Sequence, residues 1–287
     1  MDIFVRALSS GLMVLFPLGL WLAMSRRFRM GLRLVGAGAL TFVASQVLHL
    51  PFNAWGLSRI FEVLGLESAP RGQAMVLAAL LLGLSAGVFE ESARYLVYRF
   101  WLKDARTWRQ AVLFGAGHGG IEAILLGALA LLTLFQMASL RNVDLATVVP
   151  AEQLELARQQ MQAYWAASWS EALLPALERA LAVMLHISLA VTVLQALVRR
   201  NAGWLVLAIG WHAVANAAGL LALEWWGAYA AEGVIAVVVL GALGLAWRLR
   251  RPGEEGPAEA VVPLRPTLSR KEPPLRHERL DDSRYLD

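Results

Sequence analysis

The chain contains seven apolar blocks of about 20 residues, and this repetition limits its fold more than any other feature of the 287-residue sequence. An α-helix of that length spans the hydrocarbon core of a bilayer. Hydrophobic residues make up 58% of the chain, above the roughly 45–50% typical of soluble domains. We therefore predict an all-α fold, a polytopic membrane helix bundle with about seven transmembrane helices. The predicted spans are 3–24, 32–52, 73–98, 109–137, 174–198, 203–223 and 229–247.

Every second connection between these blocks is rich in positive charge. Basic residues cluster at 25–33, 99–109, 199–200 and 248–251, whereas the connections 53–72, 138–173 and 224–228 are poorer in them and carry acidic residues. The positive-inside rule then predicts that the N-terminus lies outside and the C-terminus in the cytoplasm. Because the basic residues lie at span ends, where they set topology, the net charge of +4 does not indicate a nucleic-acid partner.

Composition divides the chain into two parts. Residues 1–250 are predicted to form the transmembrane domain. Residues 251–287 are rich in proline and in charge of both signs, so they cannot bury a core, and we expect a disordered cytoplasmic tail. Within the long 138–173 connection, Leu154, Ala157, Met161 and Trp165 recur at a spacing of three or four residues. This spacing predicts an amphipathic helix at the outer membrane interface, beginning near Pro150.

Several predicted spans carry polar and ionisable side chains in their interiors, which is costly in hydrocarbon and is usually functional. These residues are Glu90, Glu91, Arg94, His118, Glu122, Glu178, Arg179, His186, His212 and Asn216. The carboxylate Glu90 and the histidines 118, 186 and 212 each lie nine to thirteen residues from the basic residue at the cytoplasmic end of their span. At the helical rise per residue, this places them roughly 14–20 Å below that edge. Four helices thus contribute one carboxylate and three histidines to a single layer.

Helical spacing groups the remaining polar residues around this layer. Residues four positions apart share a helix face, which pairs Glu90 with Arg94, His118 with Glu122, and His212 with Asn216. Glu178 and Arg179 are expected about two turns nearer the outer face, where they could close the outer mouth of a site. His49, at a span end beside Pro51, is read as a structural hydrogen-bonding group. The glycines around His118 are expected to let a neighbouring helix backbone come close.

This combination of side chains favours hydrolytic chemistry. Three neutral imidazoles with an open fourth position are typical of a catalytic zinc site, and zinc lowers the pKa of bound water to about 7. A nearby carboxylate can take the proton of the attacking water, and an asparagine or histidine can donate to the oxyanion. The chain has no cysteine, which excludes thiolate ligands and a cysteine nucleophile. We predict a hydrolytic site that lies within the membrane and is reached from its cytoplasmic half.

Three short motifs carry a family resemblance. The stretches "FEESAR", "FGAGH" and "HAVAN" resemble the motifs of the CPBP superfamily of intramembrane proteases, which is related to the PrsW proteases. The neighbourhoods "EESAR", "GHGGIEAI" and "HISLAV" more narrowly resemble the bacterial YhfC family of intramembrane metalloproteases, and the likeness covers about residues 1–250. The resemblance implies a multi-pass endopeptidase of a bacterial plasma membrane. Its substrate would be a peptide or a membrane protein, and its cofactor Zn²⁺.

The resemblance also implies roles for individual residues. Glu90, with Glu91 beside it, matches the general-base position, His118 matches the histidine of the second motif, and His212 and Asn216 match the third motif, which is assigned to oxyanion stabilisation. His186 and Glu122 lie outside the three motifs. We take Glu90, Glu91 and Asn216 as candidate catalytic residues, and His118, His186 and His212 as candidate metal ligands. The supporting residues are Arg94, Glu122, Glu178 and Arg179.

Other readings remain open at this stage. The glutamate could act with a bare histidine rather than with zinc. Paired transmembrane histidines can also ligate haem, and chains of glutamate and histidine relay protons in transporters. Neither haem binding nor electron transfer requires the adjacent glutamates. Transporters often contain inverted repeats, and no repeat is present in the sequence. A non-catalytic scaffold with a degenerate site is the last alternative.

Overall fold

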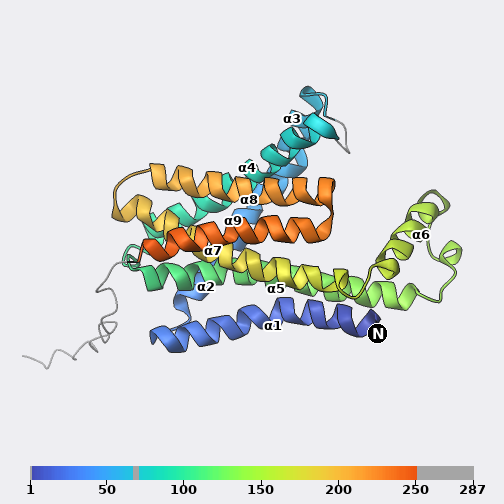
Figure 1. The fold of residues 1–287 in the computed structure, drawn as a ribbon, viewed down its shortest axis with the longest axis horizontal. Coiled ribbons are helices and arrows are strands. Elements are labelled where there is room, and N and C mark those ends of the chain that lie inside the picture. Colours follow the sequence, from blue (N-terminus) through green and yellow to red (C-terminus); the bar gives the residue numbers. More distant parts are fainter. Residues whose placement is uncertain (1, 67–70, 251–287) are drawn as a thin grey trace, which may run out of the picture. The chain divides into compact units, whose positions relative to one another are not determined.

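The protein is described here by a computed structural model that covers residues 2–66 and 71–250. The predicted disordered tail, 251–287, lies outside the described residues. Within the described ranges the chain is helical and contains no strand. Seven helical stretches in these ranges are long and apolar enough to cross a membrane. The predicted all-α polytopic bundle is therefore confirmed, and Figure 1 shows the arrangement of its helices.

The seven spans contain most of the helical elements. The spanning α-helices are α1 (Asp2–Phe28), α2 (Arg33–Pro51), α4 (Gly72–Leu96), α5 (Trp108–Leu140), α7 (Leu174–Val198), α8 (Gly203–Trp226) and α9 (Ala228–Arg248). Shorter elements are the π-helices η1 (Phe52–Leu57) and η2 (Val97–Trp101), α3 (Ser58–Val63), the 3₁₀ turns η3 (Leu145–Thr147) and η4 (Glu171–Leu173), and α6 (Ala151–Ala166).

The second span is longer than the sequence pattern predicts. Its helix does not end near residue 52 but continues through η1 and α3, so that the span covers Arg33–Val63. Proline lacks a backbone N–H, and its ring crowds the preceding turn. The wider π-helical turns that follow Pro51 accommodate this defect without ending the helix. The prediction of a span end was wrong here because a proline in a membrane helix need not terminate it.

Helix α7 is the central element of the bundle. In its most apolar window, 72% of the residues are buried inside the protein, compared with 39% or less in each of the other spans. It packs against α5 on one side and against α8 and α9 on others, while α4 pairs with α8 and α5 also contacts α1 and α2. Any side chain that α7 directs inward is thus surrounded by protein.

The backbones of α2 and α5 approach each other closely because glycines face each other across the contact. A Cβ atom at Gly38 would lie 2.0 Å from the Phe114 carbonyl oxygen, and one at Gly117 would lie 2.0 Å from the Val35 carbonyl oxygen. On the other side of α5, a Cβ at Gly119 would lie 2.8 Å from the Cβ of His186 on α7. The expected close approach of neighbouring helices around His118 is therefore present.

The predicted amphipathic helix is α6, which extends away from the bundle and has no buried residue (Figure 1). It is held to the ends of two spans by cation–π contacts. The guanidinium of Arg6 on α1 lies 4.4 Å from the ring centroid of Tyr164, and that of Arg141, which follows α5, lies 4.4 Å from Trp165. These contacts place α6 at the end of the bundle where α1 begins and α5 ends.

Candidate metal centre

Ionisable side chains from four helices meet in the interior of the bundle. Helix α4 contributes Glu90, Glu91 and Arg94, α5 contributes His118 and Glu122, α7 contributes His186, and α8 contributes His212. The three histidines are at most 3% exposed, Glu90 is 6% exposed, and Glu91 and Arg94 are fully enclosed. The expectation from residue depth, that one carboxylate and three histidines share a layer, agrees with these contacts.

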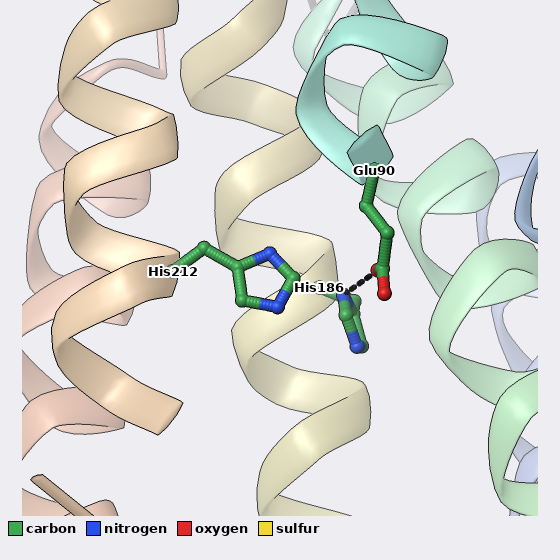
Figure 2. A group of neighbouring side chains, drawn as sticks. All are labelled: Glu90, His186 and His212. Carbon is green, nitrogen blue, oxygen red and sulfur yellow. Dashed lines mark ion pairs between the residues drawn. The ribbon is translucent and has the colours of Figure 1, made fainter. Parts of the chain in front are cut away.

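Glu90, His186 and His212 form the tightest group. One potential ligand atom from each lies within 4.8 Å of the others. Figure 2 shows the three side chains reaching toward one another from three different helices. The Nδ1 atom of His186 lies 3.9 Å from Glu90 Oε2, the contact that is dashed in the figure. Two histidines and one glutamate are a donor set that catalytic zinc sites use.

His118 lies beside this group rather than within it. Its Nε2 atom is 3.1 Å from Glu90 Oε2, and its ring centroid is 5.2 Å from that of His186. Its Nδ1 atom is buried and has no hydrogen-bond partner among the described residues. The geometry thus differs from the predicted three-histidine set, because Glu90 takes the place expected for His118.

Glu91 and Arg94, on the same helix as Glu90, contact His212 and His186. His212 Nδ1 donates to Glu91 Oε1 over 2.8 Å, and Arg94 Nη1 donates to that same oxygen. A carboxylate on one imidazole nitrogen fixes the tautomer and leaves the other nitrogen free as a ligand. Glu91 therefore orients His212, whereas Glu90 belongs to the group of potential ligand atoms. The two side chains point in different directions because neighbouring residues on a helix are separated by roughly 100°.

Both ring nitrogens of His186 already have neighbours. Arg94 Nη2 donates to its Nδ1 atom over 2.6 Å, and its Nε2 atom lies 2.6 Å from Glu122 Oε2. The second contact is a close ion pair without hydrogen-bond geometry, and Glu122 Oε2 accepts no hydrogen bond from the described residues. Because Arg94 donates to Nδ1, the ring proton lies on Nε2, and His186 can bind a metal ion through Nδ1 only when Arg94 releases that atom.

Polar residues on α2 extend the site in a direction that the sequence analysis missed. Gln46 Nε2 donates to Glu90 Oε1 over 3.3 Å, and Gln46 Oε1 lies 3.1 Å from His49 Nδ1. His49 in turn contacts Ser85 Oγ on α4 over 2.9 Å. His49 is thus linked to the centre through Gln46, although the sequence assigned it no site role. The detectable signal was the spacing of Gln46, His49 and Asn53, which places three polar residues along one side of an apolar span.

A second charged cluster lies beside a cavity at the end of the bundle where α7 begins. Arg179 on α7 donates to Glu122 over 2.7 Å and to Glu178 over 2.5 Å. The cavity, of about 520 Å³, lies between α7, α8 and α9 and is lined by Glu178, Arg179 and Asn216 among others. Asn216 is exposed there and makes no hydrogen bond within the described part of the chain. This cavity lies at the end opposite the basic connections, whereas we expected access from the cytoplasmic half.

Comparison with known proteins assigns the chain to a family. The family model described as YhfC intramembrane metalloprotease matches residues 12–239. The chain belongs to the YhfC family. An uncharacterised membrane protein YhfC of Bacillus subtilis (strain 168) is 32% identical over 246 residues, which cover 84% of this chain and 93% of the relative. No solved structure matches the chain. The family assignment and the seven spans together make this a multi-pass membrane protein.

The metal ion that the family description implies can be tested against the side chains of the centre. The cluster of Glu90, Glu91 and Arg94 has two carboxylates and one guanidinium, so it carries a formal charge of −1 when the histidines are neutral. Glu91 Oε2 and His118 Nδ1 are buried without partners among the described residues. Uncompensated charge and orphaned polar atoms are costly away from water. A divalent cation fits this combination of imidazole donors, carboxylate oxygen and negative charge.

Proposed function

We propose that this protein is a membrane-embedded metalloendopeptidase that hydrolyses a peptide bond of a peptide or membrane-protein substrate. The observation that carries the proposal is the buried group of Glu90, His186 and His212, whose ligand atoms lie within 4.8 Å of one another inside a helix bundle. Membership of a family described as intramembrane metalloproteases supports it. Hydrolysis needs a nucleophilic water, a base and a donor to the oxyanion, and residues for each lie in this region.

We assign the metal site to His186 and His212, with zinc as the ion that two imidazoles beside a carboxylate suit best. A zinc ion bound there would act as a Lewis acid and would make water a stronger nucleophile at neutral pH. Glu91 holds His212 in one tautomer through the bond to Nδ1. Arg94 positions Glu91 by donating to it, and it would have to release His186 Nδ1 before that atom could bind the metal.

Glu90 is proposed as the general base. Its carboxylate lies among the three histidine rings and is oriented by two contacts, from Gln46 to Oε1 and from His118 to Oε2. A carboxylate held this way can take a proton from water and return it to the leaving amine. His118 then acts as a positioning residue for Glu90. A second assignment, Glu90 as a metal ligand, follows from its place in the group of three.

Asn216 is proposed to stabilise the oxyanion. It lies one helical turn after His212 on α8 and lines the cavity beside the centre, with its side chain exposed there. An amide N–H that meets developing negative charge stabilises the transition state more than the ground state. Glu122, Glu178 and Arg179 form the outer boundary of the site in this assignment.

We further propose a location and an orientation. The relative from Bacillus subtilis supports the plasma membrane of a bacterium, and the alternation of basic connections supports an outer N-terminus and a cytoplasmic C-terminus. In this orientation residues 1–250 form the membrane domain and 251–287 a cytoplasmic tail. The cavity lined by Glu178, Arg179 and Asn216 then lies toward the outer half of the bilayer, the side on which α6 also lies.

A peptidase assay with matched glutamine variants tests the proposal. The full chain, supplied with zinc in lipid nanodiscs, is incubated with a library of apolar peptides, and products are identified by mass spectrometry. Glu90→Gln is expected to lower the cleavage rate by about 10²–10⁴-fold, the usual contribution of a general base. Glu62→Gln, at an exposed residue paired with Arg59, should cleave at the wild-type rate.

The same samples separate the two roles of Glu90. If Glu90→Gln loses cleavage but keeps the metal, Glu90 is the general base. If it loses both cleavage and the metal, Glu90 is a metal ligand. Cleavage by Glu90→Gln at the wild-type rate would contradict the proposal. So would the absence of cleavage by the zinc-supplied wild-type chain across the library.

A further inference from the structure

The cavity between α7, α8 and α9 is an acidic pocket with apolar walls. Most of its lining is aliphatic, including Leu185, Leu220 and Ile235, and its charged residues are Glu171, Glu178, Arg179 and Glu232. Three carboxylates and one guanidinium give the lining a formal charge of −2. At about 520 Å³ it falls within the usual size range of ligand pockets.

The one cation of the lining is already engaged. Arg179 uses Nη1 for Glu122 and Nη2 for Glu178, so its charge is divided between two carboxylates. Glu171 accepts from the backbone N–H of Ser168 and lies in the exposed turn before α7. None of these contacts includes Glu232, so neither Arg179 nor Ser168 donates a hydrogen bond to its carboxylate.

Glu232 is the carboxylate of the pocket that lacks compensation. It lies in the first turns of α9, is only 9% exposed, and its Oε2 atom is buried without a hydrogen-bond partner among the described residues. A buried carboxylate without a partner is costly and normally takes a counter-ion or a proton. The pocket thus offers a negative group at the edge of an apolar space.

The pocket also shares a wall with the metal centre. Leu185, which lines it, directly precedes His186, and Asn216 lies one turn from His212. Arg179 connects the two regions through Glu122, whose Oε2 atom lies 2.6 Å from His186 Nε2. Because Asn216 is part of the lining, a side chain held in this pocket would lie beside one of the proposed catalytic residues.

We propose that this pocket is a substrate subsite for a basic side chain, a lysine or arginine of the peptide substrate, with Glu232 as its counter-ion. The inference rests on the proposed peptidase function. Lysine and arginine have an apolar stem and a cationic head, which match the aliphatic walls and the uncompensated carboxylate. A lysine or arginine bound here would form a buried ion pair with Glu232. Such a pair discriminates strongly against an uncharged substrate side chain, which would leave the carboxylate without a counter-ion.

Binding of matched peptides tests the proposal. The probes are fluorescent decapeptides of apolar sequence that carry one lysine, scanned through all positions, each paired with a peptide that has norleucine in its place. Dissociation constants are measured by fluorescence anisotropy on the full chain in nanodiscs. At one or more positions the lysine peptide is expected to bind at least about tenfold more tightly than its norleucine partner. Glu232→Gln should remove this preference, and the control Glu155→Gln, on exposed α6, should retain it.

Three results would overturn the proposed subsite. Equal affinity of the lysine and norleucine peptides, absence of binding by both, or a preference that survives in Glu232→Gln would each do so. Glu232→Asp guards against misfolding, because it keeps the charge and should keep part of the preference. Cleavage is followed in the same samples. Charge-selective binding without cleavage would support the subsite and count against the peptidase, and cleavage without charge selectivity would do the reverse.

Discussion

Two clusters of charged side chains in this bundle have the same composition but different surroundings. The inner cluster, Glu90, Glu91 and Arg94, lies on a single helix with side chains at most 7% exposed. The outer cluster, Glu122, Glu178 and Arg179, spans α5 and α7 with side chains 14–41% exposed beside the cavity. Each has two carboxylates and one arginine, and therefore the same formal charge of −1.

The difference lies in what compensates that charge. The outer cluster borders a cavity, and its side chains are partly exposed, so its charges are less completely desolvated. The inner cluster is surrounded by protein and by the imidazoles of His118, His186 and His212. A net negative charge is retained there only if a cation or a proton joins it. The comparison therefore teaches that composition alone does not single out a metal site, and that burial among histidines is what makes the inner cluster the candidate.

The largest expected effect comes from removing the inner cation. Arg94→Met leaves Glu90 and Glu91 without their arginine and His186 without its donor. Breaking a buried pair in this way costs about 3–5 kcal/mol. Thermal unfolding in detergent, followed by the fluorescence of the 11 tryptophans, should show a large drop in stability. A melting temperature equal to that of the wild type would mean that the inner cluster is not a tightly coupled charge network.

A smaller effect is expected from Glu91→Gln, which keeps the shape of the side chain but weakens its hold on His212. Outer-shell partners of metal ligands typically contribute about 10–100-fold in metal affinity. Competition with a zinc chelator should show weaker binding of this order. Glu122 faces His186, the other proposed histidine ligand, so Glu122→Gln should be measured in the same competition experiment. If Glu91→Gln leaves the zinc affinity unchanged, Glu91 does not orient a metal ligand.

Removal of the outer cation is expected to be milder than removal of the inner one. Arg179→Met breaks the bonds to Glu122 and Glu178, but the carboxylates that remain are partly exposed, so leaving them unpaired costs less. We expect a loss of about 1.5–3 kcal/mol, the range for a hydrogen bond to a charged group. The melting temperature of Arg179→Met should lie between those of the wild type and Arg94→Met. A loss equal to that of Arg94→Met would remove the distinction between the clusters.

The smallest effect is expected from Glu178→Gln. Its side chain is 41% exposed, and its only ion pair within the described residues is with the neighbouring Arg179. Exposed ion pairs contribute about 1 kcal/mol or less. Unfolding temperature and bound zinc should both stay close to the wild type. Loss of zinc in this variant would show that the outer cluster belongs to the metal site.

The sequence predicted the shared layer of Glu90, His186 and His212 better than the contacts within it, for a physical reason. Counting residues from the basic end of each span gives depth in the membrane, and depth was enough to place Glu90, His186 and His212 in one layer. It does not give the direction in which each helix presents a residue, which depends on packing. The contact of Glu91 with His212 and the position of His118 beside Glu90 depend on that rotation. The cavity arises where α7, α8 and α9 separate, which no local pattern encodes.

Helix α2 also shows a feature that the local sequence does not predict, namely where its membrane span ends. Pro51 was read as the end of a span, and this made His49 look peripheral. Because the helix continues through η1, His49 lies within a longer span and contacts Gln46 and Ser85. Whether a proline ends or merely widens a membrane helix depends on the neighbours that satisfy its freed backbone groups. That information lies in tertiary packing rather than in the local sequence.

Metal content tests the central claim most directly. The full chain is expressed with zinc, purified in detergent and analysed for metals beside His186→Ala, His212→Ala and the control Glu178→Gln. We expect about one zinc per chain in the wild type and the control, since one site needs one ion, and loss of zinc from both histidine variants. A wild-type chain without zinc, or histidine variants that keep it, would contradict a metal centre built on His186 and His212. Iron with a haem absorption band would contradict it in favour of haem ligation.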